Sequence, residues 1–269
     1  MKKLSVAFMT ALTCLAITTA CDRGDDSATL SVVVSLTAES PSGLRITTYE
    51  YSDKGTIIGE KQTLNTVPVY EITDFDYSSG LTRYRTSHNP DGTTTRHKMV
   101  TSYLYDEINE RQVQVETLKE YLLTGPDADE TKPENTYQTY TSADQTQLPQ
   151  GYKHTNKQGE VVLQRSNFDY SAMSSGGATP SYSYVETGSS VPSPQRLTLV
   201  YENVNLRNYT LYSSSVDDTE KGIRVETREN HPGTDNTVSF TITVYPKEEG
   251  ATPIATKYTY TYENKTFTF

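Results

Sequence analysis

Alternation of tyrosine with polar residues, followed by a glycine turn, is the feature of this sequence that most restricts its fold. In the stretch 47–58, Tyr49 and Tyr51 are separated by polar residues, which gives the two-residue period of a strand with one buried face. The polar segment that follows ends at Gly55, and glycine adopts a positive φ angle without steric cost. The stretch therefore predicts a β-hairpin.

The same hairpin pattern recurs along the chain. Turn-forming residues at 41–43, 89–92 and 157–159 each separate runs that favour strands. Only 34% of the residues are hydrophobic, but 21 of them are tyrosines, and a tyrosine ring buries apolar area while its hydroxyl stays in water. We therefore predict an all-β fold, an antiparallel meander of Tyr/Thr-rich hairpins that forms a curled sheet, an open barrel or a sandwich.

Two segments rich in turn-forming residues, 125–150 and 171–194, are predicted to be long loops. The first carries Asp127, Asp129 and Glu130, whose oxygens could suggest a calcium site. The glycine and the terminal glutamate of an EF-hand loop are missing, so we assign no metal site.

The segment 107–123 has two interpretations. Val113 and Val115 alternate as in a strand, whereas Leu118, Tyr121 and Leu122 have the spacing of one face of a helix. We prefer the strand, and the helix stays open as the alternative.

The first twenty residues have the features of a secretory signal peptide. Lys2 and Lys3 precede an apolar stretch over 4–17, and small residues at 18–20 follow it. The apolar stretch is too short and too diluted by Ser and Thr for a helix that spans a membrane.

The small residues directly before Cys21 resemble the lipobox of bacterial lipoproteins, although Thr18 stands where that family usually has leucine. In that family a diacylglycerol is attached to the cysteine that becomes the first residue, which is Cys21 here. The alternative is an ordinary secretory cleavage after Ala20. The only other cysteine, Cys14, lies in the segment that cleavage would remove, so the mature chain would have no internal disulfide. Acylation would explain a single thiol in an oxidising compartment.

The lipoprotein resemblance implies three segments. These are a signal peptide (1–20), a lipidated acidic tether (21–29) and a single β-rich domain (30–269), with a subdivision near 124–150 as an alternative. The resemblance also implies attachment to a membrane of the bacterial envelope through the lipid. We favour the outer membrane, although Asp22 directly after the cysteine resembles an inner-membrane retention signal of some bacteria.

A second resemblance concerns the hairpins. The run 89–96 (Asn-Pro-Asp-Gly-Thr-Thr-Thr-Arg), followed by 103–106 (Tyr-Leu-Tyr-Asp), is similar to the tyrosine-aspartate repeats of Rhs-type proteins, and 49–55 is a degenerate copy. In that family arrays of such hairpins form large β shells. This chain holds too few copies for a closed shell, so the resemblance bears on architecture alone.

Charge limits the partners of the protein. The net charge is −10, and no run of Lys and Arg occurs that would bind nucleic acid. The C-terminal Phe269 resembles the insertion signal of outer-membrane barrels, but the strands carry too little apolar surface for a lipid-facing band. We therefore expect membrane contact through the lipid anchor and no nucleic-acid partner.

No catalytic motif is evident. The four histidines, His88, His97, His154 and His231, lack metal-ligand spacing, and no nucleophile elbow, phosphate loop or H-E-x-x-H motif occurs. We expect a non-catalytic envelope lipoprotein without cofactor or metal, with a structural or protein-interaction role. One alternative is a glycan-binding lipoprotein that uses exposed rings of Tyr182 and Tyr184, and another is a hydrolase with paired carboxylates.

Overall fold

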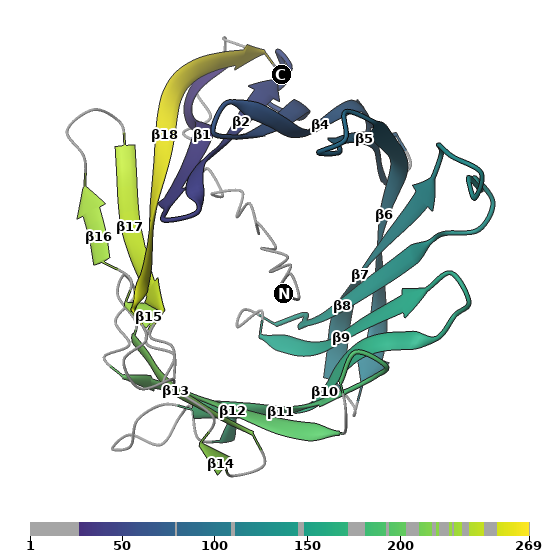
Figure 1. The fold of residues 1–269 in the computed structure, drawn as a ribbon, viewed down its shortest axis with the longest axis vertical. Coiled ribbons are helices and arrows are strands. Elements are labelled where there is room, and N and C mark those ends of the chain that lie inside the picture. Colours follow the sequence, from purple (N-terminus) through teal and green to yellow (C-terminus); the bar gives the residue numbers. More distant parts are fainter. Residues whose placement is uncertain are drawn as a thin grey trace.

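A computed structural model describes residues 27–78, 80–108, 111–144, 148–171, 181–191, 194–202, 210–216, 219–220, 226–227, 229–232, 237–244 and 252–268. About three quarters of these residues belong to strands of one antiparallel sheet, which confirms the predicted all-β meander. Of the three predicted architectures, the curled sheet is observed: the strands follow one another around a ring (Figure 1).

The strands from β1 to β9 are β1 (Ser27–Ser40), β2 (Gly43–Tyr51), β3 (Ile57–Leu64), β4 (Val67–Asp76), β5 (Leu81–His88), β6 (Thr94–Ile108), β7 (Arg111–Leu122), β8 (Asn135–Ser142) and β9 (Pro149–Asn156). The strands that follow are β10 (Val161–Asp169), β11 (Ser181–Thr187), β12 (Gln195–Glu202), β13 (Thr210–Val216), β14 (Thr219–Glu220), β15 (Glu226–Thr227), β16 (Glu229–Pro232), β17 (Thr237–Val244) and β18 (Ile254–Thr268).

The two ends of the described chain lie side by side. Each strand from β1 to β13 pairs with the next in sequence, and β18 returns to pair with β1 from Ser27 opposite Thr268 to Glu39 opposite Lys257. Among the described residues β13 also pairs with β15, β16 pairs with β17, and β17 pairs with β18. The sheet is not closed into a barrel.

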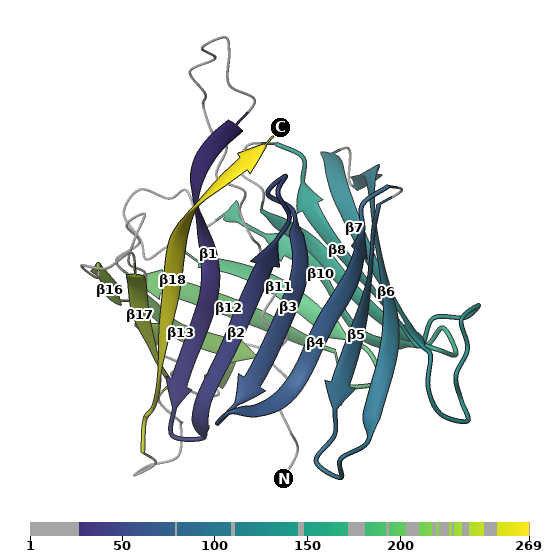
Figure 2. The ribbon, with the colours of Figure 1, turned by 90° about the horizontal axis from the view of Figure 1, so that it is seen from above.

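Alternating strand directions define two rims of the sheet. We call the N-terminal rim the edge at which β1 begins and β18 ends, which Figure 2 shows together. Because the neighbouring strands are antiparallel, the strands β2, β4, β6, β8 and β10 end at this same rim, and β3, β5, β7, β9 and β11 begin there.

The predicted turns occupy the predicted places. Gly55 has φ = 77°, and its amide donates to the carbonyl of Ser52 at 3.0 Å. Gly159 has φ = 84° and donates to Asn156 at 2.9 Å. One turn was not predicted. Asn65 and Thr66 both have positive φ angles, 49° and 72°, which lets a two-residue connection join β3 to β4.

The segment 107–123 is a strand for most of its length, since β7 pairs with β6 on one side and β8 on the other, which confirms the preferred interpretation. Several other predicted boundaries are wrong. The two predicted loops contain β8 and β11, because backbone pairing on both sides favours a strand even where Thr, Ser and Gln outnumber aliphatic residues. The sheet also begins at Ser27 rather than Leu30, since β18 is long enough to pair with the first residues of β1.

The core is thin and partly polar. The buried apolar side chains are Tyr49, Ile72, Met99, Val113, Val115, Tyr184 and Phe267. Thr47, Thr101, Thr117, Glu120, Ser142 and Glu186 are buried as well. A core of this kind depends on hydrogen bonds and ion pairs between strands, because each buried polar group needs a partner.

Candidate functional site

One face of the sheet concentrates the tyrosines. Residues paired across a ladder project from the same face, and so do residues two apart on one strand. By this rule Tyr49, Tyr70, Tyr137, Tyr152 and Tyr184 share one face from β2 to β11. We call it the tyrosine face.

The first cluster on this face surrounds Glu60. The hydroxyl of Tyr70 donates to Glu60 Oε1 at 2.5 Å. Burial raises the pKa of Tyr70, and the neighbouring Glu60 carboxylate raises it further. The pKa of Tyr49 is raised by burial and then by the same carboxylate. Both phenols therefore stay protonated at neutral pH, and Tyr70 binds its neighbouring strand as a hydrogen-bond donor.

The second cluster centres on Glu120, which is 5% exposed. Arg85 Nη1 lies 3.3 Å from Glu120 Oε1, and the hydroxyl of Tyr137 donates to Oε2 at 3.2 Å. Tyr137 in turn stacks on the His154 ring, with centroids 4.5 Å apart and the planes at 21°. The cluster thereby joins β5, β7, β8 and β9 through side chains.

Three buried polar atoms close to this cluster have no hydrogen-bond partner among the described residues: Arg85 Nε, His97 Nδ1 and Glu134 Oε2. Burial lowers the pKa of His97, and the positive charge of Arg85 lowers it further. His97 is therefore neutral at pH 7, so its ring adds no positive charge beside the Arg85 guanidinium.

The third cluster joins β9, β10 and β11. Arg165 Nε donates to Glu186 Oε1 at 2.8 Å. Its guanidinium also lies over the rings of Tyr152 and Tyr184, at 5.6 and 5.5 Å from the centroids. Such cation–π contacts fix the rings as well as the charge.

Four aromatic rings are stacked beside this ion pair, and we call them the aromatic quartet: Phe168, Tyr170, Tyr182 and Tyr184. Phe168 stacks on Tyr184 with centroids 5.1 Å apart, and Tyr170 stacks on Tyr182 at 5.3 Å. The interplanar angles of these two pairs are 22° and 28°. The quartet extends the tyrosine face to the N-terminal rim, because β10 ends at that rim and Tyr170 directly follows its last residue.

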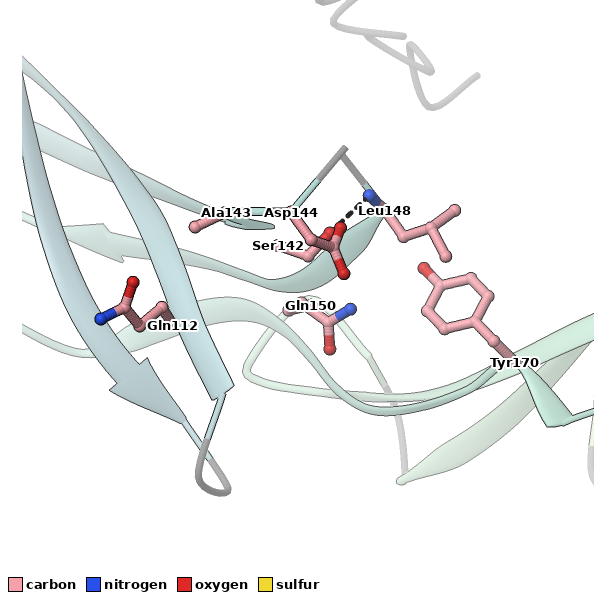
Figure 3. A pocket seen from close by; sticks show the side chains of 7 residues that line it. All are labelled: Gln112, Ser142, Ala143, Asp144, Leu148, Gln150 and Tyr170. Carbon is pink, nitrogen blue, oxygen red and sulfur yellow. Dashed lines mark hydrogen bonds between the residues drawn. The ribbon is translucent and has the colours of Figure 1, made fainter. Parts of the chain in front are cut away.

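A cleft of about 500 Å³ opens beside Tyr170. Its lining residues come from the rim ends of four strands: Gln112, Ser142, Ala143, Asp144, Leu148, Gln150 and Tyr170. Figure 3 shows Gln112 at one side of the cleft and Tyr170 with Leu148 at the other, with Asp144 and Gln150 between them. We call it the rim cleft.

Backbone hydrogen bonds hold the walls of the rim cleft. The amide of Ala143 donates to the carbonyl of Gln112 at 3.0 Å, and that of Ser142 donates to Leu148 at 2.9 Å. The Leu148 amide donates in return to the Ser142 hydroxyl at 2.9 Å. Tyr170 is fixed from its polar end, since its hydroxyl donates to the Pro149 carbonyl at 2.5 Å.

The residues predicted for ligand binding lie next to the cleft but do not line it. Tyr184 is 8% exposed, covered by Phe168 and Arg165, so the prediction of an exposed Tyr184 ring is wrong. Tyr182 is half-buried and stacks on Tyr170. The predicted pair therefore supports the cleft residue Tyr170, which sequence reasoning missed. Cys21, the predicted lipidation site, lies outside the described residues.

The sequence gives little signal for the rim cleft. Gln112 lies on β7, Gln150 lies on β9, and Asp144 follows the end of β8. All three are polar residues like many others in the chain. Only Tyr170 has a local indication, because Phe168 and Tyr170 alternate at the end of a predicted strand. Their meeting depends on the register of β7 to β10.

Among the described residues, no group of three or more His, Cys, Asp or Glu side chains is placed to hold a metal ion. That part of the chain also contains no helix long and apolar enough to cross a membrane. Comparison of the chain with family models, with curated proteins and with solved structures gave no match.

Proposed function

We propose that this chain is a lipid-anchored, non-catalytic protein of the bacterial envelope with a structural or protein-interaction role at the outer membrane. The observation that carries the proposal is the use of the acids on the tyrosine face. Glu60, Glu120 and Glu186 each accept a hydrogen bond from a Tyr or Arg of a neighbouring strand. A catalytic acid or base must reach a substrate, whereas these carboxylates connect strands.

The anchor is supported by the distance from Cys21 to the sheet. Only the five residues 22–26 separate Cys21 from Ser27, the first residue of β1. Five extended residues span at most roughly 18 Å. Acyl chains on Cys21 would therefore keep the N-terminal rim of the sheet close to the bilayer surface, since each buried CH₂ contributes about 0.8 kcal/mol of membrane affinity.

The face opposite the tyrosine face supports attachment through the anchor alone. It carries the ion pairs Lys61–Glu50 and Arg96–Asp74, with side chains 48–62% exposed. Charged side chains are costly in hydrocarbon. We therefore assign membrane contact to the lipid rather than to this charged part of the opposite face.

A protein-interaction role is supported by exposed apolar side chains at the rim end of β6. Tyr103, Leu104 and Tyr105 are 52%, 66% and 75% exposed. Tyrosine is enriched in protein interfaces because it offers a large contact area with few rotatable bonds. These three residues are the first to replace in a search for a partner.

The anchor is tested by fractionation and by metabolic labelling with a radioactive fatty acid. Cys21→Ser is expected to lose the label and to move from the membrane to the soluble fraction. Cys14→Ser is the matched control, because it changes the only other cysteine and leaves the acylation site intact. A Cys21→Ser variant that keeps the label, or that stays membrane-bound, would contradict the anchor.

A further inference from the structure

We propose that the rim cleft binds a neutral saccharide, with Tyr170 as the stacking platform and the amides of Gln112 and Gln150 as hydrogen-bonding groups. The binding itself goes beyond the proposed function and does not require the anchor. Only the position of the saccharide, near the membrane surface, rests on the proposed lipidation of Cys21.

The first argument is the rigidity of the platform. Tyr170 is held by the hydrogen bond from its hydroxyl to Pro149 and by stacking on Tyr182 at 5.3 Å and Phe168 at 6.1 Å. A ring fixed before binding loses little side-chain entropy when a ligand stacks on it. The C–H face of a sugar ring is the apolar surface of a carbohydrate, and Tyr170 with Leu148 provides an apolar wall for it.

The second argument is the kind of polar groups that face this wall. Each glutamine amide offers both a donor and an acceptor, and the Asp144 carboxylate offers acceptors. Sugar hydroxyls also donate and accept, so vicinal hydroxyls can pair with amide and carboxylate groups at once. Such a mixed set of hydrogen-bond donors and acceptors suits a polyhydroxylated ligand better than a purely apolar ligand.

The third argument is charge. Among the described residues, the seven that line the rim cleft include no cationic side chain and include the carboxylate of Asp144. The whole chain has a net charge of −10. An anionic ligand such as a phosphate or a sugar acid would be repelled, which favours a neutral saccharide.

The size and preformed shape of the rim cleft agree with this ligand class. Its volume of about 500 Å³ lies within the range of about 300–1,000 Å³ that is usual for small-ligand sites. Its walls are tied by the backbone hydrogen bonds from Ala143 to Gln112 and from Ser142 to Leu148.

The test is calorimetric titration of the full chain carrying Cys21→Ser, so that binding is measured without a membrane. The probes are the neutral disaccharides maltose, cellobiose, lactose and chitobiose, with sialyllactose as an anionic probe and an extended neutral peptide as a third class. Concentrations up to about 10 mM detect dissociation constants near a millimolar. We expect at least one neutral disaccharide to bind and the anionic probe not to bind.

Variants connect the binding to the rim cleft. Tyr170→Ala is expected to weaken binding by about tenfold or more, since a central aromatic contact carries much of the binding energy. Tyr170→Phe keeps the ring and is expected to lose roughly threefold or less. Gln150→Ala, which leaves the quartet intact, is expected to weaken binding by about threefold to tenfold. Tyr84→Ala, on the opposite face of β5, is the matched control and should bind as the parent does.

The proposal would be overturned if no neutral disaccharide bound, or if only the peptide or only sialyllactose bound. It would also be overturned if Tyr170→Ala and Gln150→Ala bound a disaccharide as tightly as the parent does, once thermal unfolding had shown that both variants are folded. Failure of the anchor gives a different result, since Cys21→Ser would then stay in the membrane fraction while disaccharide binding persisted.

Discussion

The two faces of the sheet hold their charged groups in different surroundings. On the tyrosine face, Arg85 and Glu120 pair at 3.3 Å with side chains 30% and 7% exposed. On the opposite face, Lys61 and Glu50 pair at 3.5 Å with side chains 53% and 61% exposed. The distances are nearly equal, so solvent access separates the two pairs. The difference teaches that the Arg85–Glu120 pair of the tyrosine face contributes rigidity, whereas the exposed Lys61–Glu50 pair contributes charge that is in contact with water.

The largest difference in stability is expected between alanine substitutions of two tyrosines, one on each face of the sheet. Replacing Tyr184 by alanine removes a buried ring that contacts Phe168 and Arg165, and should lower the free energy of unfolding by about 3–4 kcal/mol. Tyr84→Ala on the opposite face removes a contact with Arg96 and should cost about 1 kcal/mol or less. Urea unfolding of the two variants measures both values. Equal losses would mean that the faces do not differ in packing.

A smaller difference in stability is expected when one carboxylate is removed from an ion pair on each face. Glu120→Ala leaves the Arg85 guanidinium partly buried without its partner and should cost about 3 kcal/mol. Glu50→Ala, the matched variant on the opposite face, should cost less than about 0.5 kcal/mol because water screens its pair with Lys61. The same unfolding experiment applies. A large loss in Glu50→Ala would show that this exposed pair also holds the sheet.

Single hydroxyl groups should sharpen the comparison further. Tyr137→Phe removes the hydrogen bond to Glu120 and should cost about 1–1.5 kcal/mol. Tyr140→Phe, on the other face of the same strand, should change stability by less than about 0.5 kcal/mol. Thermal unfolding at neutral pH compares the two, and a neutral Tyr137→Phe would argue against the Glu120 cluster as a stabilising element.

Acidification should act on the tyrosine face through His97. Its pKa in the folded protein lies below the value of 6.5 in the unfolded chain, mainly because of burial. As the pH falls through 6.5 the unfolded chain binds more protons than the folded one, so stability should decrease on acidification below about pH 6.5.

His97→Gln isolates this effect, because it should flatten the dependence of unfolding free energy on pH in that range. His154, whose pKa is also lowered by burial, should supply the part of the dependence that persists. A His97→Gln variant with the full pH dependence of the parent would assign the effect to other groups.

The hairpin pattern could be predicted from the sequence because it depends on local chemistry. The alternation of Tyr49 and Tyr51 and the glycine at position 55 each favour the observed conformation on their own. Strand β8 was missed because Tyr137 and Tyr140 stand three residues apart and give no two-residue period. Strand β11 was missed although Tyr182 and Tyr184 alternate with serine, because it lies in a segment rich in Ser, Gly and Pro. Both strands pair with neighbours on both sides.

The site was less accessible to prediction for the same reason. Tyr182 and Tyr184 indicated the right part of the sheet, because two tyrosines in a polar segment suggest a role beyond a loop. Tyr170 and Gln112 lie far apart in the sequence, and only the register from β7 to β10 brings them to one cleft.

A double-mutant cycle tests the difference between the two faces most directly. The unfolding free energies of Arg85→Ala, Glu120→Ala and the double variant give the coupling energy of one pair, and those of Lys61→Ala, Glu50→Ala and their double variant give that of the other. We predict a coupling of about 2 kcal/mol or more for Arg85 with Glu120 and less than about 0.5 kcal/mol for Lys61 with Glu50. Equal couplings, or a larger one on the opposite face, would contradict a tyrosine face that holds the sheet together.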